Sequence, residues 1–481
     1  MLHLPHVLRA RRKPADGLVL RLEWRADLGT GRRPHVGVAS ALILSAAVGF
    51  TGCDGGRSTL GFVGGTAVTV RDSAGVEIVE NHEPEHPPGA FWTLGEEPEF
   101  VLGGAGSDIG ANIWKVRDIA RLADGRIAIL SQGNHQVFLY EPSGLLSKVI
   151  GGRGRGPGEF VRPERMQYLP PDTLAVSDYS MGPVTYFDTA GTVLRTRPID
   201  LARTLDLLPE RSAEHPRTPL PDGSFVVAAW QHDPQFERPR EGEVYRYPSV
   251  EFLRIDSLYT ARSLGVWDGL EWWSVPKTVQ EMSATASPET QTFHLLDSHV
   301  AVGGDPPSIY ITNGDRNEIR QFSGDGSLVR IIRRTTPPVP VTARADRAWR
   351  RRMISLAMSL GQDYLKPFVE SLPRRDSWPA VATLVVDTKG HLWAREWSDS
   401  ESGVPDRWSV FSPRGRWLGV LVGWSDLFLC RSPSAPCWIG DDLFLLVRHG
   451  DHGVERVEGY AIRSDGRPLA ASTSPISSRA N

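Results

Sequence analysis

The histidines and glutamate of HEPEH (82–86) have the spacing of a zinc site, in which two histidines bind the metal and the glutamate activates a bound water. That chemistry needs both histidines on one face of a helix. Pro84 lies inside the motif and Pro87 follows it directly, and proline removes a backbone donor and clashes with the preceding helical turn. The sequence therefore favours an extended polar linker at 82–86. RHGDHG (448–453) could also hold a metal, but we favour an exposed polar loop there over a metal site.

The glycine-rich stretch GGRGRGPGEF (151–160) is a candidate phosphate loop, because glycines let several backbone N–H groups converge on an anion. It fails the G-x-G-x-x-G spacing in every register, and we expect a strand after it, so no helix N-terminus is present to hold a phosphate. A degenerate copy, GGAGSD (103–108), lies 48 residues upstream. We interpret the loop as part of a repeated unit, in which Phe160 fills the space between two neighbouring sheets.

A pattern of short apolar strands, Gly/Asp turns and an aromatic residue four positions before a glycine recurs along the chain. It occurs at 116–144, 166–191, 308–326, 384–415 and 443–466, with a weaker copy at 225–230 and 250–257 that lacks the glycine. Each copy predicts about four short strands, and a unit of that size cannot bury its apolar face alone. Six such units predict an all-β fold, a six-bladed β-propeller. A pair of β-sandwiches would not explain the repeated turn.

Residues 151–191 resemble an NHL-type repeat, in which G-x-G-x-GPGEF precedes a proline, a strand, an aspartate-containing loop and a strand that ends before glycine. Over about residues 70–470 the chain resembles the exported bacterial six-bladed β-propellers of unassigned function. Those proteins share the GPGEF loop and an early segment similar to VRDSAGVEIVEN (70–81). This resemblance implies the fold and says little about activity.

The N-terminus has the organisation of an export signal. Residues 1–52 contain eight Lys/Arg and three Asp/Glu, and the uncharged run 36–50 is followed by Cys53. FTGC (50–53) resembles a bacterial lipobox, which implies acylation of Cys53; a plain secretory signal or an anchor helix is the alternative. We expect a lipoprotein-type leader over 1–52, a linker and N-terminal strand over 53–90, the propeller over 91–470 and a disordered tail over 471–481.

Two segments outside the repeat complete the expected organisation. Residues 92–102 read as a strand that closes the ring against the last blade. Residues 343–371 have a helical period and predict a helical insertion between blades four and five. Its apolar stripe consists of Trp349, Met353, Leu356 and Leu360. The insertion either lies on the propeller by this stripe or acts as a lid or partner-docking helix, with arginines 350–352 turned outward.

Composition narrows the class of protein. Proteins that bind nucleic acid normally carry an excess of basic residues, whereas this chain has a net charge of −3. We therefore expect a monomer without a nucleic-acid partner. With Cys53 acylated, the remaining cysteines, Cys430 and Cys437, form a candidate disulfide in an oxidising compartment. Two free buried thiols are the alternative.

The candidate site follows from the architecture, because in a propeller the loops between the second and third strands of each blade gather around one mouth of the central channel. The expected ligand-binding residues are Arg153, Arg155, Asp178, Trp230, Asn313, Arg395 and Trp397. We predict a binding or scaffolding module for a protein, peptide or glycan, lipid-anchored in the cell envelope or secreted, with no cofactor and no identified catalytic residue. The alternative is a lactonase- or lyase-like enzyme with a divalent metal such as Ca²⁺. The metal ligands would then be Asp118, Glu164, Asp178 and Asn313.

Overall fold

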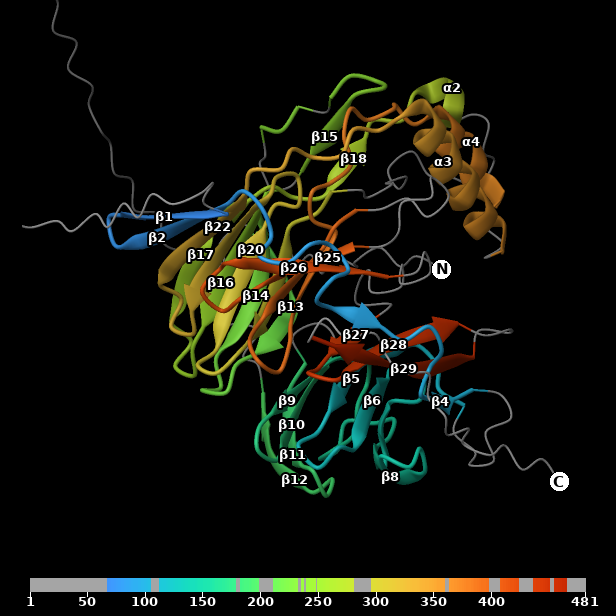
Figure 1. Ribbon diagram of the computed structural model, residues 1–481. Helices are drawn as coiled ribbons and strands as arrows, with labels where there is room; N and C mark the ends of the chain where they lie inside the picture. The colour runs from blue at the N-terminus through green and yellow to red at the C-terminus, as the bar shows by residue number, and fades with distance from the viewer. Residues whose placement is uncertain are drawn as a thin grey trace, which may run out of the picture. The chain divides into compact units, whose positions relative to one another are not determined.

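The strands form separate, mostly antiparallel sheets, and each blade is built largely from one segment of the chain, with strands from residues 68–103 added to two of the sheets (Figure 1). The computed structural model describes residues 67–104, 112–178, 182–198, 211–231, 235–237, 239–247, 249–280, 296–359, 363–397, 407–423, 436–449 and 454–464. The expected leader, Cys53, Cys430 and the expected C-terminal tail lie outside these residues. Within each blade, the innermost three strands are antiparallel neighbours in chain order, starting with the strand that enters from the preceding blade.

The first three blades follow one another along the chain. Blade 1 contains β5 (Val116–Arg121), β6 (Ile127–Ser131), β7 (Gln136–Tyr140) and β8 (Leu146–Gly151). Blade 2 contains β9 (Pro163–Leu169), β10 (Thr173–Asp178), β11 (Val184–Asp188) and β12 (Val193–Arg197). Blade 3 contains β13 (Arg211–Pro219), β14 (Phe225–Gln231), β16 (Val250–Ile255) and β17 (Ala261–Trp267).

The other three blades complete the set, so the six predicted units correspond to six blades. Blade 4 contains β19 (His299–Gly303), β20 (Ser308–Thr312), β21 (Glu318–Ser323) and β22 (Leu328–Arg334). Blade 5 contains β23 (Thr383–Val386), β24 (Leu392–Arg395), β25 (Arg407–Phe411) and β26 (Trp417–Val422). Blade 6 contains β27 (Cys437–Ile439), β28 (Leu443–His449), β29 (Glu455–Arg463) and β4 (Phe100–Gly103).

A buried apolar cluster lies between each pair of neighbouring blades, including blades 6 and 1. Strand β6 shows how the sequence produces this arrangement. Ile127 and Ile129 pack toward blade 6, whereas Ala128 and Leu130 pack toward blade 2. Successive side chains of a strand point to opposite faces of the sheet, so a blade with a neighbour on both sides needs apolar residues at every position. The closed set of clusters confirms the six-bladed β-propeller.

The repeated glycine has a geometric reason. Gly144, Gly191, Gly326 and Gly415 have φ between +76° and +86° in the turn between the third and fourth strands. Each donates its N–H to the carbonyl three residues earlier, and a three-residue hairpin loop of this kind needs a left-handed residue. In blade 3 the position is taken by Tyr259 at φ +62°, which is why the weaker copy of the repeat lacks the glycine.

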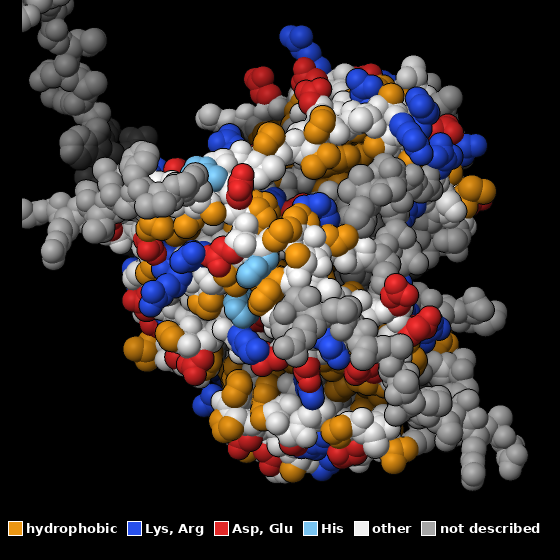
Figure 2. Space-filling view, in the orientation of Figure 1, with side chains coloured by type: hydrophobic (Ala, Val, Ile, Leu, Met, Phe, Trp, Pro, Cys, Tyr) orange, Lys and Arg blue, Asp and Glu red, His pale blue; other side chains and the backbone are white. Residues whose placement is uncertain are grey.

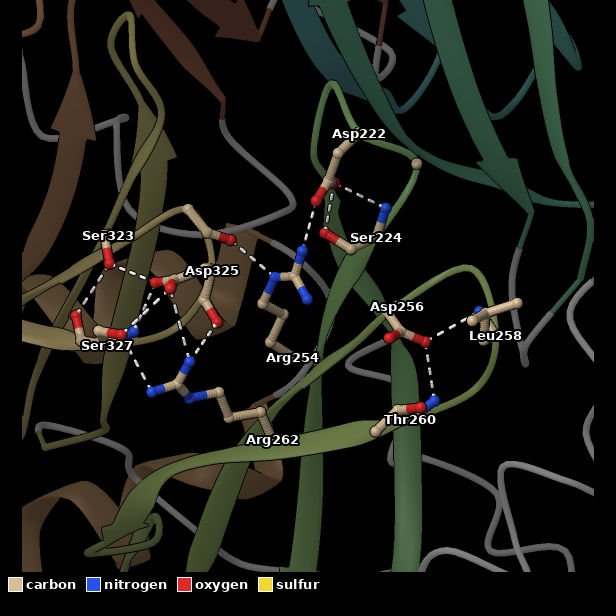
Figure 3. Close-up of polar contacts among 12 residues, drawn as sticks. Asp222, Ser224, Arg254, Asp256, Leu258, Thr260, Arg262, Ser323, Asp325 and Ser327 are labelled. Atoms are coloured by element: carbon tan, nitrogen blue, oxygen red, sulfur yellow. Dashed lines mark hydrogen bonds and ion pairs between the residues drawn. The ribbon is translucent and has the colours of Figure 1, made fainter.

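Arginines join the tight turns of neighbouring blades on this side of the propeller (Figure 3). Arg254 of blade 3 donates to the carbonyl of Gly324 in blade 4 at 2.6 Å and forms an ion pair with Asp222. Arg262 donates to the carbonyl of Asp325 at 3.0 Å. Hydrogen bonds from serine hydroxyls and a backbone N–H lower the pKa of Asp325 to about 2.

Residues 67–103, here called the N-terminal strap, run along the outer strands of three blades. Strands β1 (Val68–Ser73) and β2 (Val76–Asn81) form a hairpin, and β2 pairs in parallel with β22, which widens the sheet of blade 4 to six strands. HEPEH (82–86) then runs extended along β26, as predicted, with the His86 N–H donating to the carbonyl of Leu418 at 3.0 Å. Strands β3 (Thr93–Leu94) and β4 both pair with β29 of blade 6. The N-terminal strand therefore closes the ring, as expected from 92–102, and the described part of 53–90 contains two strands instead of one.

One side chain holds the strap to two blades. Asn81 is 1% exposed, and its amide nitrogen donates to the carbonyls of Arg333 at 3.1 Å and Gly415 at 3.0 Å. Its amide oxygen accepts the Trp417 N–H at 2.8 Å. These three bonds tie the strap to backbone groups of blades 4 and 5.

The predicted helical insertion lies between blades 4 and 5. It consists of α3 (Ala343–Ser359), a 3₁₀ turn η1 (Asp363–Leu365) and α4 (Lys366–Ser371). Trp349 and the partly buried Met353 pack in one cluster with Trp378 and Trp397, whereas Leu356 and Leu360 lie outside the described side chains. No helix of the described residues is long and apolar enough to cross a bilayer.

The outward orientation expected for Arg350 is wrong. Its guanidinium pairs with Asp346 at 2.9 Å and donates to the carbonyls of Val369, Glu370 and Leu372. The last carbonyls of a short helix have no intrahelical donor. Asp346, four positions before Arg350, holds the guanidinium where it can satisfy these carbonyls of α4. Arg350 therefore joins α3 to α4.

Candidate functional site

One face of the propeller is formed by the connections between blades and by the loops between the second and third strands of each blade. We call it the connection face. The first strands of neighbouring blades contact one another around the centre: β5 contacts β9 and β27, and β23 contacts β19 and β27. Polar side chains at the ends of these strands therefore lie close to the central axis.

One polar cluster on this face joins blades 1 and 2. Glu164 is 6% exposed and accepts a hydrogen bond from Gln132 at 2.8 Å. Arg162 lies 3.1 Å and Arg117 3.6 Å from its carboxylate oxygens, and Arg117 also donates to Gln132 at 2.9 Å. The carboxylate is thus neutralised by two guanidinium groups and an amide, which makes it part of the wall between two blades.

Asp118 bridges the first strands of the same two blades. Its carboxylate accepts the N–H of Met166 at 3.0 Å and that of Ile119 at 3.1 Å. Burial raises the pKa of Asp118 to about 6, an effect that the charge of Arg165 and the two N–H donors oppose. The group therefore titrates near neutrality while it holds β9 against β5.

Asp178 and Asn313 occupy equivalent places in blades 2 and 4. Asp178 accepts the N–H groups of Val161 at 2.9 Å and Arg162 at 3.0 Å, which belong to the connection entering its blade. Asn313 accepts the N–H of Asp268 at 3.1 Å in the connection between blades 3 and 4. Burial raises the pKa of Asp178, and the two backbone hydrogen bonds oppose it. Both residues fix the blade-to-blade connections.

Blade 1 contains a third member of this set, Asn134, which accepts the Trp114 N–H at 3.1 Å. The recurrence is visible in the sequence only in part: an Asp or Asn ends or directly follows the second strand in blades 2 and 4, whereas Asn134 lies three residues after the end of β6. Its role is not visible there, because the donors are backbone groups of a connection that has no repeated sequence.

The predicted metal ligands are divided between two regions. Asp118, Glu164 and Asp178 belong to blades 1 and 2, whereas Asn313 belongs to blade 4. Within the described ranges, no group of three or more His, Cys, Asp or Glu side chains is arranged to hold a metal. The four residues instead make the arginine, amide and backbone contacts given above.

The glycine-rich loop is closed by its own glutamate. The Glu159 carboxylate accepts the Gly156 N–H at 2.8 Å. A Cβ on Gly154 would lie 1.8 Å from a Glu159 oxygen, so a larger residue there would force the Glu159 side chain to move. Phe160 is 2% exposed and packs between blades 1 and 2, which confirms its predicted role. Arg153 and Arg155 are exposed on this loop.

The aromatic candidates contribute mainly to packing. Trp230 is buried in the cluster between blades 3 and 4. Trp397 stacks on Trp378 with ring centroids 5.6 Å apart. Arg395 is 2% exposed at the end of β24.

Cys437 is disulfide-bonded, and Cys430 lies outside the described residues.

A narrow pocket lies between the helical insertion and a two-stranded sheet, β15 (Val244–Arg246) and β18 (Glu271–Trp273). Figure 1 shows β15 and β18 beside α2 (Lys277–Gln280), α3 and α4. The cavity has a volume of about 30 Å³. It is lined by Val244, Glu271, Trp272, Trp273, Val341, Asp346, Trp349, Leu372, Pro373, Arg375 and Trp378.

The pocket combines tryptophans with a buried ion pair. Glu271 is 7% exposed and pairs with Arg375 from the segment after α4. Trp349 is 4% exposed, and its indole N–H has no hydrogen-bond acceptor among the described residues. Trp273 is buried and Trp272 partly exposed, as expected for adjacent residues of a strand. A buried donor without an acceptor is costly, which makes the Trp349 N–H a candidate donor to a polar ligand atom.

Among the lining residues, Arg375 and Trp378 could not be identified from the sequence. These two residues follow α4 and lie about 100 positions from β18 in the chain, and no local pattern connects them to it. Only the folding of two separate connections onto one face brings them together.

The chain matches no protein-family profile and no curated protein sequence. It is similar in structure to a Bacteroides fragilis protein described as exported, with 11% identity, a TM-score of 0.40 and coverage of 81% of this chain and 99% of that one. It is also similar to a DUF4221 family member from Bacteroides vulgatus, with 9% identity, a TM-score of 0.41 and coverage of 78% and 99%. Virginiamycin B lyase from Staphylococcus aureus matches with 10% identity, a TM-score of 0.35 and coverage of 77% and 99%.

Proposed function

We propose that this chain is a lipid-anchored propeller of the bacterial cell envelope that binds a protein, peptide or glycan ligand on its connection face. The anchor would be Cys53, because a basic segment and an uncharged apolar run precede it. The protein would act as a monomer without a nucleic-acid partner. The GPGEF loop at 156–160 supports a relationship of its blades to NHL-type repeats.

The observation that carries the binding function is the tryptophan-lined pocket. It lies on the face where ligands of a propeller are expected, and aromatic walls with a few placed polar groups are typical of binding sites. The Glu271–Arg375 pair and the pairing of Asp346 with Arg350 leave the pocket without a net charge, so it would suit a neutral group that accepts a hydrogen bond from Trp349. A cavity of about 30 Å³ admits one small group of a larger ligand, since a single water needs about 10–15 Å³ by the same measure.

A pair of matched substitutions tests this site. Val244 lines the pocket on β15 and is 45% exposed, so Val244→Trp should block the pocket without changing a blade core. Val266 on β17 is 56% exposed and does not line the pocket, which makes Val266→Trp the control. Arrays of envelope glycans and peptides probed with the full chain would supply the ligand, and calorimetry its affinity. We expect at least a tenfold loss for Val244→Trp and no loss for Val266→Trp; equal losses would exclude the pocket.

The metal-dependent enzyme is the rival function, and metal analysis separates it from the binding module. The purified chain would be analysed for metal before and after chelation. Stoichiometric Ca²⁺ together with chelator-sensitive lactone hydrolysis, and no array ligand, would favour the enzyme. An array ligand whose affinity is unchanged by chelator would favour the binding module.

A further inference from the structure

Three arginines share the outward face of α3. Arg344, Arg347 and Arg351 are spaced three and four residues apart, so they lie on one side of the helix, and all three are exposed. The opposite side carries Ala345 and Trp349, which pack in the cluster beneath the insertion. The packing of that stripe fixes the arginine face toward solvent.

This face keeps its positive charge. Arg344 and Arg347 have no ion-pair partner among the described residues, and the one acidic residue of α3, Asp346, is paired with Arg350. Residues 343–376 hold eight Lys/Arg and four Asp/Glu in a chain whose net charge is −3. Figure 2 shows Lys and Arg side chains gathered over the region where Figure 1 places α3 and α4.

Exposed apolar groups accompany the arginines. Met358, near the end of α3, is 56% exposed, and Tyr364 in η1 is 38% exposed. A soluble polyanion would use the arginines alone. Basic side chains next to exposed apolar and aromatic ones are typical of helices that lie on an anionic bilayer, where Tyr occupies the headgroup level.

We propose that the outward face of α3, with Met358 and Tyr364, docks on the anionic phospholipid surface of the membrane that holds the protein. This inference rests on the envelope location in the proposed function but not on the pocket. A weak lipid anchor is stabilised by a basic patch on the same protein, because each charge near an anionic surface adds to the attraction. The contact would fix which face of the propeller meets the membrane.

Vesicle co-sedimentation tests the proposal on the full chain carrying Cys53→Ser, which removes any acyl group. Vesicles of phosphatidylglycerol with phosphatidylcholine would be compared with vesicles of phosphatidylcholine alone. The variant Arg344→Gln/Arg347→Gln retains good helix formers, and its melting curve would check the fold. We expect its binding to the anionic vesicles to fall about 30-fold, from roughly 1 kcal/mol per charge. The control Arg71→Gln/Arg316→Gln removes two exposed charges outside the insertion and should bind as the parent does.

The outcomes separate the alternatives. Equal binding to anionic and neutral vesicles, or an unchanged affinity of the α3 variant, would overturn the proposal. Binding to an acidic polymer without binding to vesicles would also overturn it and would favour an acidic macromolecule as the partner. Mass spectrometry of the N-terminal peptide from the wild-type chain would test acylation of Cys53 separately, so loss of the anchor and loss of the α3 contact are distinguishable.

Discussion

Asn81→Leu tests whether the N-terminal strap stabilises the propeller or only decorates it. Leucine has the same branching as asparagine and is not smaller, so the change removes hydrogen bonds without leaving a cavity. It leaves the Trp417 N–H and the Gly415 carbonyl, which Asn81 now pairs, buried without partners. An unpaired buried group costs about 1–3 kcal/mol, so we expect the free energy of unfolding to fall by roughly 3 kcal/mol. With an unfolding entropy of about 2.1 cal/mol/K per residue over roughly 400 residues, the melting temperature should fall by about 3–4 °C.

Differential scanning calorimetry of the full chain would measure this shift, and hydrogen exchange would show whether the Trp417 amide loses protection. The control is Asn112→Leu, an exposed asparagine at which the same change should alter stability by less than about 0.5 kcal/mol. If Asn81→Leu and Asn112→Leu have the same melting temperature, the hydrogen bonds of Asn81 do not hold the strap to blades 4 and 5.

Three further predictions concern the blades. Because burial raises the pKa of Asp118 to about 6, the folded protein binds the Asp118 proton more tightly than the unfolded chain does. The stability that this group contributes therefore falls as the pH rises from about 4 to 6, by at most about 3 kcal/mol. Urea unfolding at pH 4.5 and 7 should show that Asp118→Asn reduces this loss. Gly191→Ala should lower the melting temperature more than Gly75→Ala does. Both glycines have positive φ, but only a Cβ on residue 191 would lie 2.8 Å from Ile150. Equal losses would mean that backbone strain alone determines the effect. Arg254→Met should cost about 1.5–3 kcal/mol and the more exposed Arg262→Met less than about 1 kcal/mol, and the reverse order in denaturant titrations would refute the blade-joining role of Arg254.

The blades could be predicted from sequence because their turn is chemically restrictive. A left-handed residue at Gly144, Gly191, Gly326 and Gly415 leaves a glycine that can be recognised at each repeat. Tyr259 shows the limit, since a tyrosine in the same conformation hides the third blade from pattern matching. The helical insertion was also predictable, because its apolar stripe has a period different from that of the strands.

The candidate site was less predictable, because the residue type does not reveal the partner. Asp178 and Asn313 have the chemistry of ligand-binding groups, yet both accept backbone N–H groups from neighbouring connections. Arg350 lies in a run of arginines, and only the position of α4 shows that it turns inward. Glu271 and Arg375 meet through two connections that are far apart in sequence, so their pairing is a property of the folded ring.

The closure of blade 6 has a consequence for folding. Strand β4 precedes blade 1 in the chain, but its partner β29 is near the C-terminus. The chain is synthesised N-terminus first, so β4 has an unpaired hydrogen-bonding edge until almost the whole polypeptide has been made. Contacts this distant in sequence form slowly, and an unpaired edge is prone to aggregation. The interval between the appearance of β4 and that of β29 is therefore the period in which this protein most needs a chaperone, and a chain truncated before β29 would lose the closure of the ring together with its last blade.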